Sequence, residues 1–386
     1  MHRLILVLAT ASAVLATLVP VAAAGPGVGS VTIKAARNSI KFGQWVRIEG
    51  RARPAVDNEL VTIIDREDGP IAQTRTDADG RYGLWLQPKE NLRIRARTLT
   101  AKSTFEAIGV VVVVKVGMGK VNLFGRAKTS GSVKPAQPGK KAIVRLYRNG
   151  KLAQRKKVRL QNGRRFRAGF DIRKPGSFKA KVTFGTADLK PGSDATGKRK
   201  TRLPVLSVGS RGGYVKRLEK RLIQLGYVIP RADSSFDVPT RDAMYAFHKI
   251  QRRARSGVVT ESTWRALSSP KRPKPRSRSP RSHIEIDQTR QVVMWVRKGK
   301  VKWILHTSTG AGGATRDGVF RMHREVHGYS PGRLYYPSYF DGLRAIHGWP
   351  EVPNYPASHG CARIPMWAAV WANNRSPIGM QVRVYH

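Results

Sequence analysis

A single cysteine, Cys361, occurs in the 386 residues of this chain. It lies in the stretch YPASHGCARIP, with His359 and Gly360 directly before it. A lone cysteine cannot form a disulfide within its own chain, so its sulfur is either inert and buried or used chemically. The residues around it therefore decide which chemistry to expect.

A second histidine, His347, lies upstream in an Ile-His-Gly stretch, and the pattern is open to three interpretations. The thiol is a nucleophile if His347 acts as its base and Gly360 lets a backbone come close to the reacting group. Two histidines and a cysteine also suit zinc, but no C-x-x-C or H-x-x-x-H spacing supports a metal site, and no cofactor is expected. The third possibility is a buried thiol beside a hydrogen-bonded core histidine.

The N-terminal residues predict export. Arg3 precedes an apolar run that is broken at Pro20 and followed by Ala22, Ala23 and Ala24, which is the pattern of a signal peptide covering residues 1–24. An uncleaved membrane anchor is the alternative. In both cases the rest of the chain is expected outside the cytoplasm, secreted and associated with the cell wall. An unpaired thiol in an oxidising compartment favours a reactive role for Cys361.

The charge of the chain is extreme. Its 72 Lys and Arg residues outnumber 24 Asp and Glu, which gives a formal net charge of +48. Residues 116–203 alone hold 25 Lys and Arg against three Asp. Such an excess predicts attraction to anionic cell-envelope polymers, although any single lysine or arginine is more simply explained as part of a solvated strand face. Nucleic acid is not expected as a partner, because the chain is predicted to be exported and its basic Pro/Ser/Arg-rich stretch, residues 268–282, has no interleaved stacking aromatics.

Two N-terminal segments, residues 30–115 and 116–203, show short alternating runs separated by Asp-Gly and Asn-Gly turns. They also repeat each other, since Gly50-Arg51-Ala52 matches Gly125-Arg126-Ala127. This pattern predicts two tandem Ig-like β-sandwiches with a spacing or adhesive role. The apolar run Ile108–Val116 has the length of one β-strand.

Residues 206–268 change to helical periodicity. Four apolar residues at helical spacing end at Gly226, and two further helices are expected at residues 239–252 and 260–267. This three-helix unit resembles the peptidoglycan-binding type 1 domain. The resemblance rests on Leu225-Gly226-Tyr227, Phe236 and Thr240, Ala243 and Phe247, and Thr263-Trp264 with Leu267. Residues 269–282, rich in Pro, Ser and Arg, predict an extended basic linker.

The β pattern returns in residues 283–386, with a hairpin turn expected at Lys298-Gly299. This segment resembles the L,D-transpeptidase catalytic domain of bacterial cell-wall synthesis. The resemblance rests on Ile346-His347-Gly348, on Ser358-His359-Gly360-Cys361-Ala362-Arg363, and on Thr315 and Gly318 ahead of Phe320. The expected fold is thus multidomain and mostly β: two sandwiches, a three-helix domain and a β-rich catalytic domain.

The resemblance implies a cysteine-dependent acyltransferase of peptidoglycan biosynthesis, with a role in cell-wall biogenesis and cell shape. Cys361 would attack the carbonyl of meso-diaminopimelate in a tetrapeptide stem and release D-alanine. His347 would act as general base and acid, and the N–H groups of Gly360 and Cys361 would stabilise the oxyanion. The amine of a neighbouring stem peptide would then accept the acyl group and form a 3→3 cross-link.

Further residues are expected to shape this site. Ser358, His359 and Arg363 adjoin the cysteine, and Arg363 is a candidate for holding a substrate carboxylate. Tyr336 and Tyr339 are candidates for lining the donor groove, with core or surface packing as the alternative. His359 competes with His347 for the role of base. Other functions remain open: a hydrolase with the same acyl-enzyme, and a non-catalytic wall-binding protein.

Overall fold

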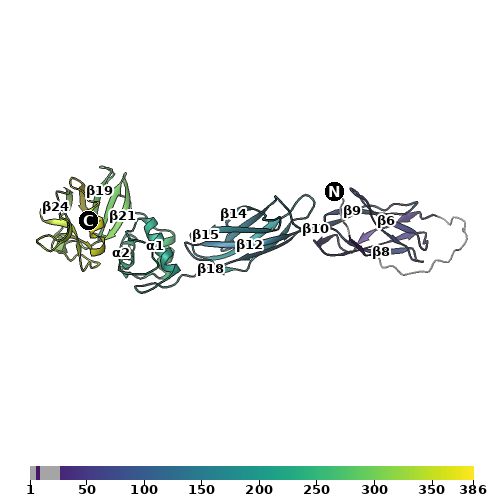
Figure 1. Ribbon diagram of the computed structural model, residues 1–386, viewed down its shortest axis with the longest axis horizontal. Helices are drawn as coiled ribbons and strands as arrows, with labels where there is room; N and C mark the ends of the chain where they lie inside the picture. The colour runs from purple at the N-terminus through teal and green to yellow at the C-terminus, as the bar shows by residue number, and fades with distance from the viewer. Residues whose placement is uncertain (1–5, 9–26) are drawn as a thin grey trace. The chain divides into compact units, whose positions relative to one another are not determined.

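The computed structural model describes residues 6–8 and 27–386 (Figure 1). The expected signal peptide lies outside the described residues, apart from Leu6–Leu8. Within the described part of the chain, no helix has the length and apolar character needed to span a membrane. The chain forms two compact units. Residues 121–126, 171–176 and 200–386 make up the second, and the first contains the rest of the chain up to Arg199.

The first sandwich of the first unit consists of two sheets. One sheet contains β1 (Leu6–Leu8), β8 (Arg81–Gln87), β5 (Val46–Arg53), β2 (Ser30–Val31) and β3 (Lys34–Ala35). The other contains β4 (Ser39–Lys41), β10 (Glu106–Val111), β9 (Leu92–Arg97), β6 (Leu60–Asp65) and β7 (Gly69–Arg75).

A second sandwich follows along the chain. Its smaller sheet contains β11 (Val113–Met118), β12 (Arg126–Lys134) and β15 (Arg165–Asp171). Its larger sheet contains β14 (Lys151–Arg159), β13 (Lys141–Arg148), β16 (Ser177–Phe184), β17 (Gly192–Ala195) and β18 (Arg199–Lys200). The predicted multidomain, mostly β fold with sandwich modules is confirmed.

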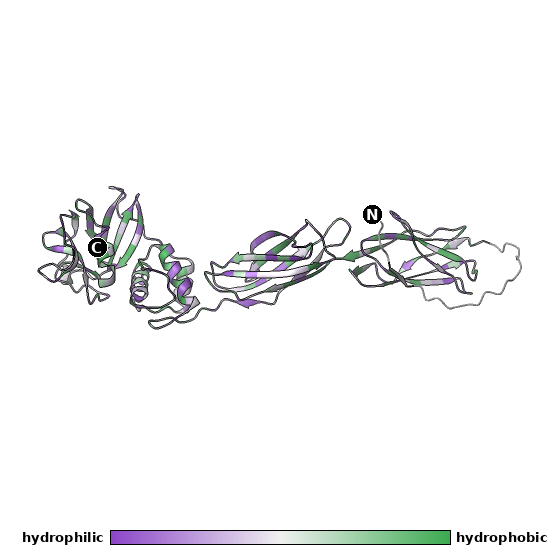
Figure 2. Ribbon diagram, viewed as in Figure 1, coloured by the Kyte–Doolittle hydropathy of each residue, from purple (hydrophilic) through white to green (hydrophobic). Residues whose placement is uncertain are grey.

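Alternation along the strands explains why these segments form sheets with one buried face. In β15, Phe166 and Phe170 are fully buried while the arginines between and before them are exposed. A side-chain period of two is what a half-buried strand requires. Figure 2 shows this alternation as neighbouring hydrophobic and hydrophilic stripes on the strands.

The apolar run at residues 108–116 was predicted to be one strand, but the structure divides it at Val112. β10 pairs with β4 and β9, whereas β11 pairs with β12. The N–H of Val112 donates to the carbonyl of Lys190 at 3.1 Å instead of joining either ladder. One continuous apolar run therefore supplies a strand to each sandwich.

The three helices of the second unit are α1 (Gly213–Leu225), α2 (Val238–Ile250) and α3 (Glu261–Ser268). α1 ends where predicted, at Gly226, whose φ of 94° is left-handed and suits glycine. The side chains of Asp237 and Thr260 cap the next two helices by accepting from N–H groups in the first turn.

The C-terminal domain has two sheets and one helix. The larger sheet contains β21 (Lys300–His306), β20 (Val292–Arg297), β19 (His283–Asp287), β27 (Gln381–Tyr385) and β22 (Gly318–Arg321). The smaller sheet contains β23 (Arg324–Glu325), β24 (Tyr335–Asp341), β25 (Arg344–Trp349) and β26 (Ala362–Pro365), and it leads into α4 (Met366–Asn373). The predicted hairpin turn is present between β20 and β21, with positive φ at Lys298 and Gly299.

The helices and the C-terminal sheet share one hydrophobic core. Val292, Met294 and Ile304 of the sheet pack in the same buried cluster as the inward residues of α1, α2 and α3. The predicted linker contains no helix or strand, yet it is bonded to the C-terminal domain. The guanidinium of Arg276 donates to the carbonyl of His386 at 3.0 Å, for example. The helical and catalytic segments therefore form one body.

A buried lysine on α2 links the helices to the C-terminal domain through hydrogen bonds. Lys249 is 2% exposed, and its Nζ donates to the carbonyls of Gln291 and Thr307 at 2.9 and 3.0 Å. Its third contact is with Nδ1 of His306 at 2.5 Å, and Nε2 of that histidine contacts the carbonyl of Val352 at 2.8 Å. Burial and the neighbouring lysine hold the pKa of His306 well below its usual value, so the ring is neutral and accepts from Nζ of Lys249. Burial also holds the pKa of Lys249 well below its usual value.

We predict that Lys249→Met lowers the free energy of unfolding by about 3 kcal/mol, because three buried acceptors lose their donor. Chemical denaturation measures the change. Lys216→Met on α1, where the side chain is exposed, serves as the matched control and should change stability by less than about 0.5 kcal/mol. Equal effects of the two substitutions would contradict the stabilising role of the Lys249 hydrogen bonds.

Candidate active site

Strand pairing brings the two predicted catalytic segments together. β25 and β26 are parallel neighbours, with Ile346 opposite Ala362 and His347 opposite Arg363. Ile346 and Ala362 point into the core between the sheets. Because side chains alternate along a strand, His347 faces the other side, together with Arg363 and the cysteine that precedes Ala362. Cys361 is thus one diagonal step from His347 on the same face.

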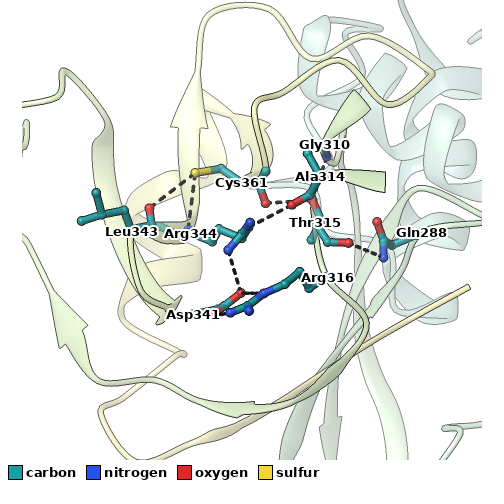
Figure 3. Close-up of polar contacts among 11 residues, drawn as sticks. Gln288, Gly310, Ala314, Thr315, Arg316, Asp341, Leu343, Arg344 and Cys361 are labelled. Carbon is teal, nitrogen blue, oxygen red and sulfur yellow. Dashed lines mark hydrogen bonds and ion pairs between the residues drawn. The ribbon is translucent and has the colours of Figure 1, made fainter. Parts of the chain in front are cut away.

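The thiol of Cys361 is partly buried and has two backbone neighbours. Its Sγ accepts from the N–H of Ala345 at 3.4 Å and approaches the carbonyl of Leu343 at 3.9 Å (Figure 3). Burial raises the pKa of the thiol, and the Ala345 N–H and the charges of Arg363 and Arg344 oppose that rise. In the resting site the sulfur is therefore a neutral thiol near pH 7.

His347 is also neutral at rest. The side chain is 2% exposed, and burial lowers its pKa to about 4. Its Nδ1 contacts the carbonyl of Gly348 at 3.0 Å, which fixes that nitrogen as the N–H and leaves Nε2 as the basic atom. The ring packs edge-on to Trp349. No hydrogen bond joins the imidazole to the thiol among the residues described, and such contacts often tighten only when substrate binds.

The backbone before Cys361 adopts a conformation that requires glycine. Gly360 has a φ of 137°, and a Cβ there would lie 2.9 Å from Nε of Arg344 and 3.1 Å from the carbonyl of Ala314. Thr315 supports this turn by donating its hydroxyl to the Gly360 carbonyl at 2.8 Å. The threonine of the upstream motif therefore positions the cysteine loop.

Ser358 forms two hydrogen bonds within the same loop. Its hydroxyl donates to the carbonyl of Cys361 at 2.5 Å and accepts from the N–H of Gly360 at 3.1 Å. The Gly360 N–H was predicted to be an oxyanion donor, but in this conformation it is already bonded to Ser358. Ser358 thus shapes the loop, and the predicted donor role for Gly360 would require that bond to open.

Sequence reasoning missed a charged cluster beside the thiol (Figure 3). Arg344 donates to the carbonyl of Ala314 at 2.9 Å and to Asp341 at 3.1 Å, and Arg316 binds the same carboxylate. The Arg316 guanidinium is the main reason that the pKa of Asp341 lies below its usual value. The sequence does offer one signal, since Asp341 and Arg344 flank a Gly-Leu turn just ahead of the Ile-His-Gly stretch.

The remaining predicted residues differ in how close they lie to the thiol. Arg363 lies beside it and stacks its guanidinium over Trp349 at 5.1 Å. His359 is exposed, whereas His347 is buried on the strand that neighbours β26. Tyr339 is 4% exposed and packs under the guanidinium of Arg324, which fits the core alternative. Tyr336 is half-buried and stacks on His327.

Hydrogen bonds to other parts of the chain hold residues 352–355 of the segment between His347 and Ser358. The hydroxyl of Ser308 donates to the carbonyl of Tyr355 at 2.7 Å. Asn354 exchanges hydrogen bonds with the backbone and side chain of Arg255, which follows α2. The helical domain therefore helps to fix the segment that leads into the cysteine loop.

The described residues contain no group of three or more His, Cys, Asp or Glu side chains suited to holding a metal ion. The chemistry that this arrangement supports is nucleophilic attack by a thiol, with a neutral imidazole as proton acceptor, in a two-sheet β domain.

Comparisons with known proteins agree with this class. A family model for the L,D-transpeptidase catalytic domain matches residues 281–384, and one for a peptidoglycan binding domain matches residues 211–267. No curated protein matches the chain. The C-terminal domain therefore belongs to the L,D-transpeptidase catalytic domain family, and a peptidoglycan binding domain precedes it.

Several solved structures are similar. The L,D-transpeptidase from Xylanimonas cellulosilytica is 36% identical, over 48% of this chain and 98% of that one, with a TM-score of 0.44. An L,D-transpeptidase from Stackebrandtia nassauensis is 21% identical over 47% of this chain and 95% of the other, with a TM-score of 0.30. One from Mycobacterium smegmatis is 9% identical over 71% of this chain and 99% of the other, with a TM-score of 0.24.

We predict that the rate at which iodoacetamide alkylates Cys361 increases with pH through an inflection above the usual range of a free cysteine, because burial raises the pKa of the thiol. Arg344→Gln should move the inflection to still higher pH, since a positive charge that stabilises the thiolate is removed. Mass spectrometry of alkylated protein over a pH series measures both.

Arg316→Gln is the control for this experiment, because Arg316 binds the same carboxylate but is not among the groups that shift the pKa of the thiol. An inflection at acidic pH in the unmodified protein would contradict the neutral resting thiol. So would an equal shift in the two arginine variants.

Proposed function

We propose that this protein is a peptidoglycan L,D-transpeptidase that cross-links stem peptides through a Cys361 acyl-enzyme. The matches to the two family models support an acyl-transferring domain at the C-terminus that acts on peptidoglycan. The nucleophile, the base, the intermediate and the 3→3 linkage are the proposed parts.

The mechanism begins with a proton transfer. As the Sγ of Cys361 attacks the carbonyl carbon of meso-diaminopimelate in a tetrapeptide stem, its proton passes to Nε2 of His347. The carbonyl becomes a tetrahedral oxyanion, which backbone N–H groups at the cysteine loop stabilise. The intermediate collapses, the bond to D-alanine breaks, and His347 returns the proton to the leaving amine. A thioester between Cys361 and the donor stem remains.

The second half of the reaction, in which the acyl group leaves the enzyme, repeats these steps in reverse order. The side-chain amine of a neighbouring stem attacks the thioester carbonyl and gives a proton to His347. The carbon–sulfur bond then breaks, and the proton returns to the thiol. The products are an amide cross-link and the free enzyme. One amide is broken and one is formed, so no external energy source is needed.

The observation that carries this proposal is the parallel register of β25 and β26. It places the thiol and a buried imidazole on one face, with Nδ1 of the imidazole already bonded to the Gly348 carbonyl. A ring held this way presents Nε2 as its only free base. His359, by contrast, is exposed and lies on the loop itself. We therefore assign the role of general base to His347.

We also propose where the protein is located and which polymers it binds there. The N-terminal pattern supports export and association with the cell wall. The excess of Lys and Arg in residues 116–203 supports binding to anionic envelope polymers. Arg363 and Arg344, which flank the thiol, are suited to hold a carboxylate of the stem peptide.

A test uses the full chain, a tetrapeptide stem as donor and a second stem as acceptor, with mass spectrometry of protein and products. We expect an acyl-enzyme and a cross-linked dimer. Cys361→Ser should abolish both, since a hydroxyl is far less nucleophilic. His347→Gln should slow acylation by roughly two or more orders of magnitude, the range of general acid–base catalysis.

His359→Gln is the matched control, and it should slow acylation much less than His347→Gln does. If His359→Gln is the more damaging change, the two histidines exchange roles. If D-alanine is released but no dimer forms in the presence of acceptor, the protein is a hydrolase with the same acyl-enzyme. Cross-linking that persists in Cys361→Ser would overturn the assignment of the nucleophile.

A further inference from the structure

A cavity of about 640 Å³ lies within the second unit, away from the thiol, and it is surrounded by positive charge. Its walls come from α1, from the end of α3, and from two loops next to β12 and β15. Six cationic side chains line it, against one carboxylate, Asp171. The cationic residues are Arg126, Arg173, Lys174, Arg217, Lys220 and Arg221. A volume of this size is typical of a ligand pocket.

The two loops are built into the helical domain. Phe124 donates its N–H to the carbonyl of Ile172 at 2.8 Å, and Ile172 donates to the carbonyl of Gly125 at 2.9 Å. Leu123 is buried in the core of the helices, and the hydroxyl of Tyr214 on α1 donates to Asn122 at 3.0 Å. These contacts give the cavity fixed walls.

The cations on α1 are held close together in spite of their mutual repulsion. Arg217 and Arg221 are four residues apart on one helical face, a spacing at which like charges destabilise a helix. Burial lowers the pKa of both guanidinium groups, and Arg272 and Arg173 lower that of Arg221 further. This arrangement is unfavourable until negative charge enters the cavity.

Arg217 in particular has hydrogen-bonding capacity to spare. Its guanidinium lies over the ring of Tyr214 at 4.5 Å, and a Cβ on Gly125 would lie 3.6 Å from its Cδ. Its Nε is buried and has no hydrogen-bond partner in the part of the chain that the structure describes. A buried donor without a partner is costly, and a ligand oxygen would satisfy it. Arg221, by contrast, already donates its Nε to the carbonyl of Leu267.

From this geometry we infer a second binding site, which takes a multivalent oxyanion: a polymer that carries repeated phosphate or carboxylate groups. Guanidinium forks on several sides match the oxygens of such groups, and the volume accommodates more than one of them. The inference deepens the proposed binding of anionic envelope polymers by giving it a defined location. It does not depend on the transpeptidation chemistry.

The test titrates the full-length protein with inorganic tripolyphosphate and, in a second arm, with polyglutamate, by calorimetry in a phosphate-free buffer. We expect saturable binding of at least one of the two, and the comparison separates phosphate from carboxylate as the preferred group. The double variant Arg173→Gln/Lys220→Gln should weaken that binding by about tenfold for each charge-assisted hydrogen bond that it removes. Both side chains are exposed, so the fold should tolerate the changes.

Lys216→Gln is the matched control, because Lys216 is an exposed lysine of α1 that does not line the cavity. It should leave the affinity within about twofold. Equal weakening by the control and the cavity variants, or no saturable binding of either polyanion, would overturn the inference. The assay contains no stem peptide, so its failure would be distinct from a failure of the transpeptidase proposal.

Discussion

Because β25 and β26 run parallel and in register, a thiol and an imidazole from separate segments share one face of a sheet. Everything else at the site supports that pairing. The glycine conformation at residue 360 lets the loop enter β26, and Thr315 and Ser358 hold it there. A shift of the register by one residue would turn the cysteine toward the hydrophobic core and leave no nucleophile at the surface.

The electrostatics of the site favour a neutral resting state. Burial raises the pKa of the thiol and lowers that of His347, so neither carries charge near pH 7. In the proposed mechanism, this neutral pair transfers its proton only as the substrate carbonyl is attacked. Arg344 forms an ion pair with Asp341, and its positive charge opposes the rise in the pKa of the thiol.

The helical domain belongs to the catalytic body. It shares a hydrophobic core with the C-terminal sheet, and Nζ of Lys249 contacts three acceptors of the catalytic domain. Through His306 and Arg255 the same helices contact the segment that leads to the cysteine loop. The domain that resembles peptidoglycan-binding modules and the catalytic domain thus share one hydrophobic core.

Local sequence signals are enough to predict the strands with alternating burial, α1 with its glycine end, and the candidate nucleophile in its Ser-His-Gly-Cys motif. The Ile-His-Gly motif also predicts His347 as a candidate base. Three features could be seen only in the folded chain: the bond from Gly360 to Ser358, the ion pairs of Asp341 with Arg316 and Arg344, and the division of one apolar run between two sheets. These features depend on contacts between residues far apart in the chain, and local periodicity carries no information about such contacts.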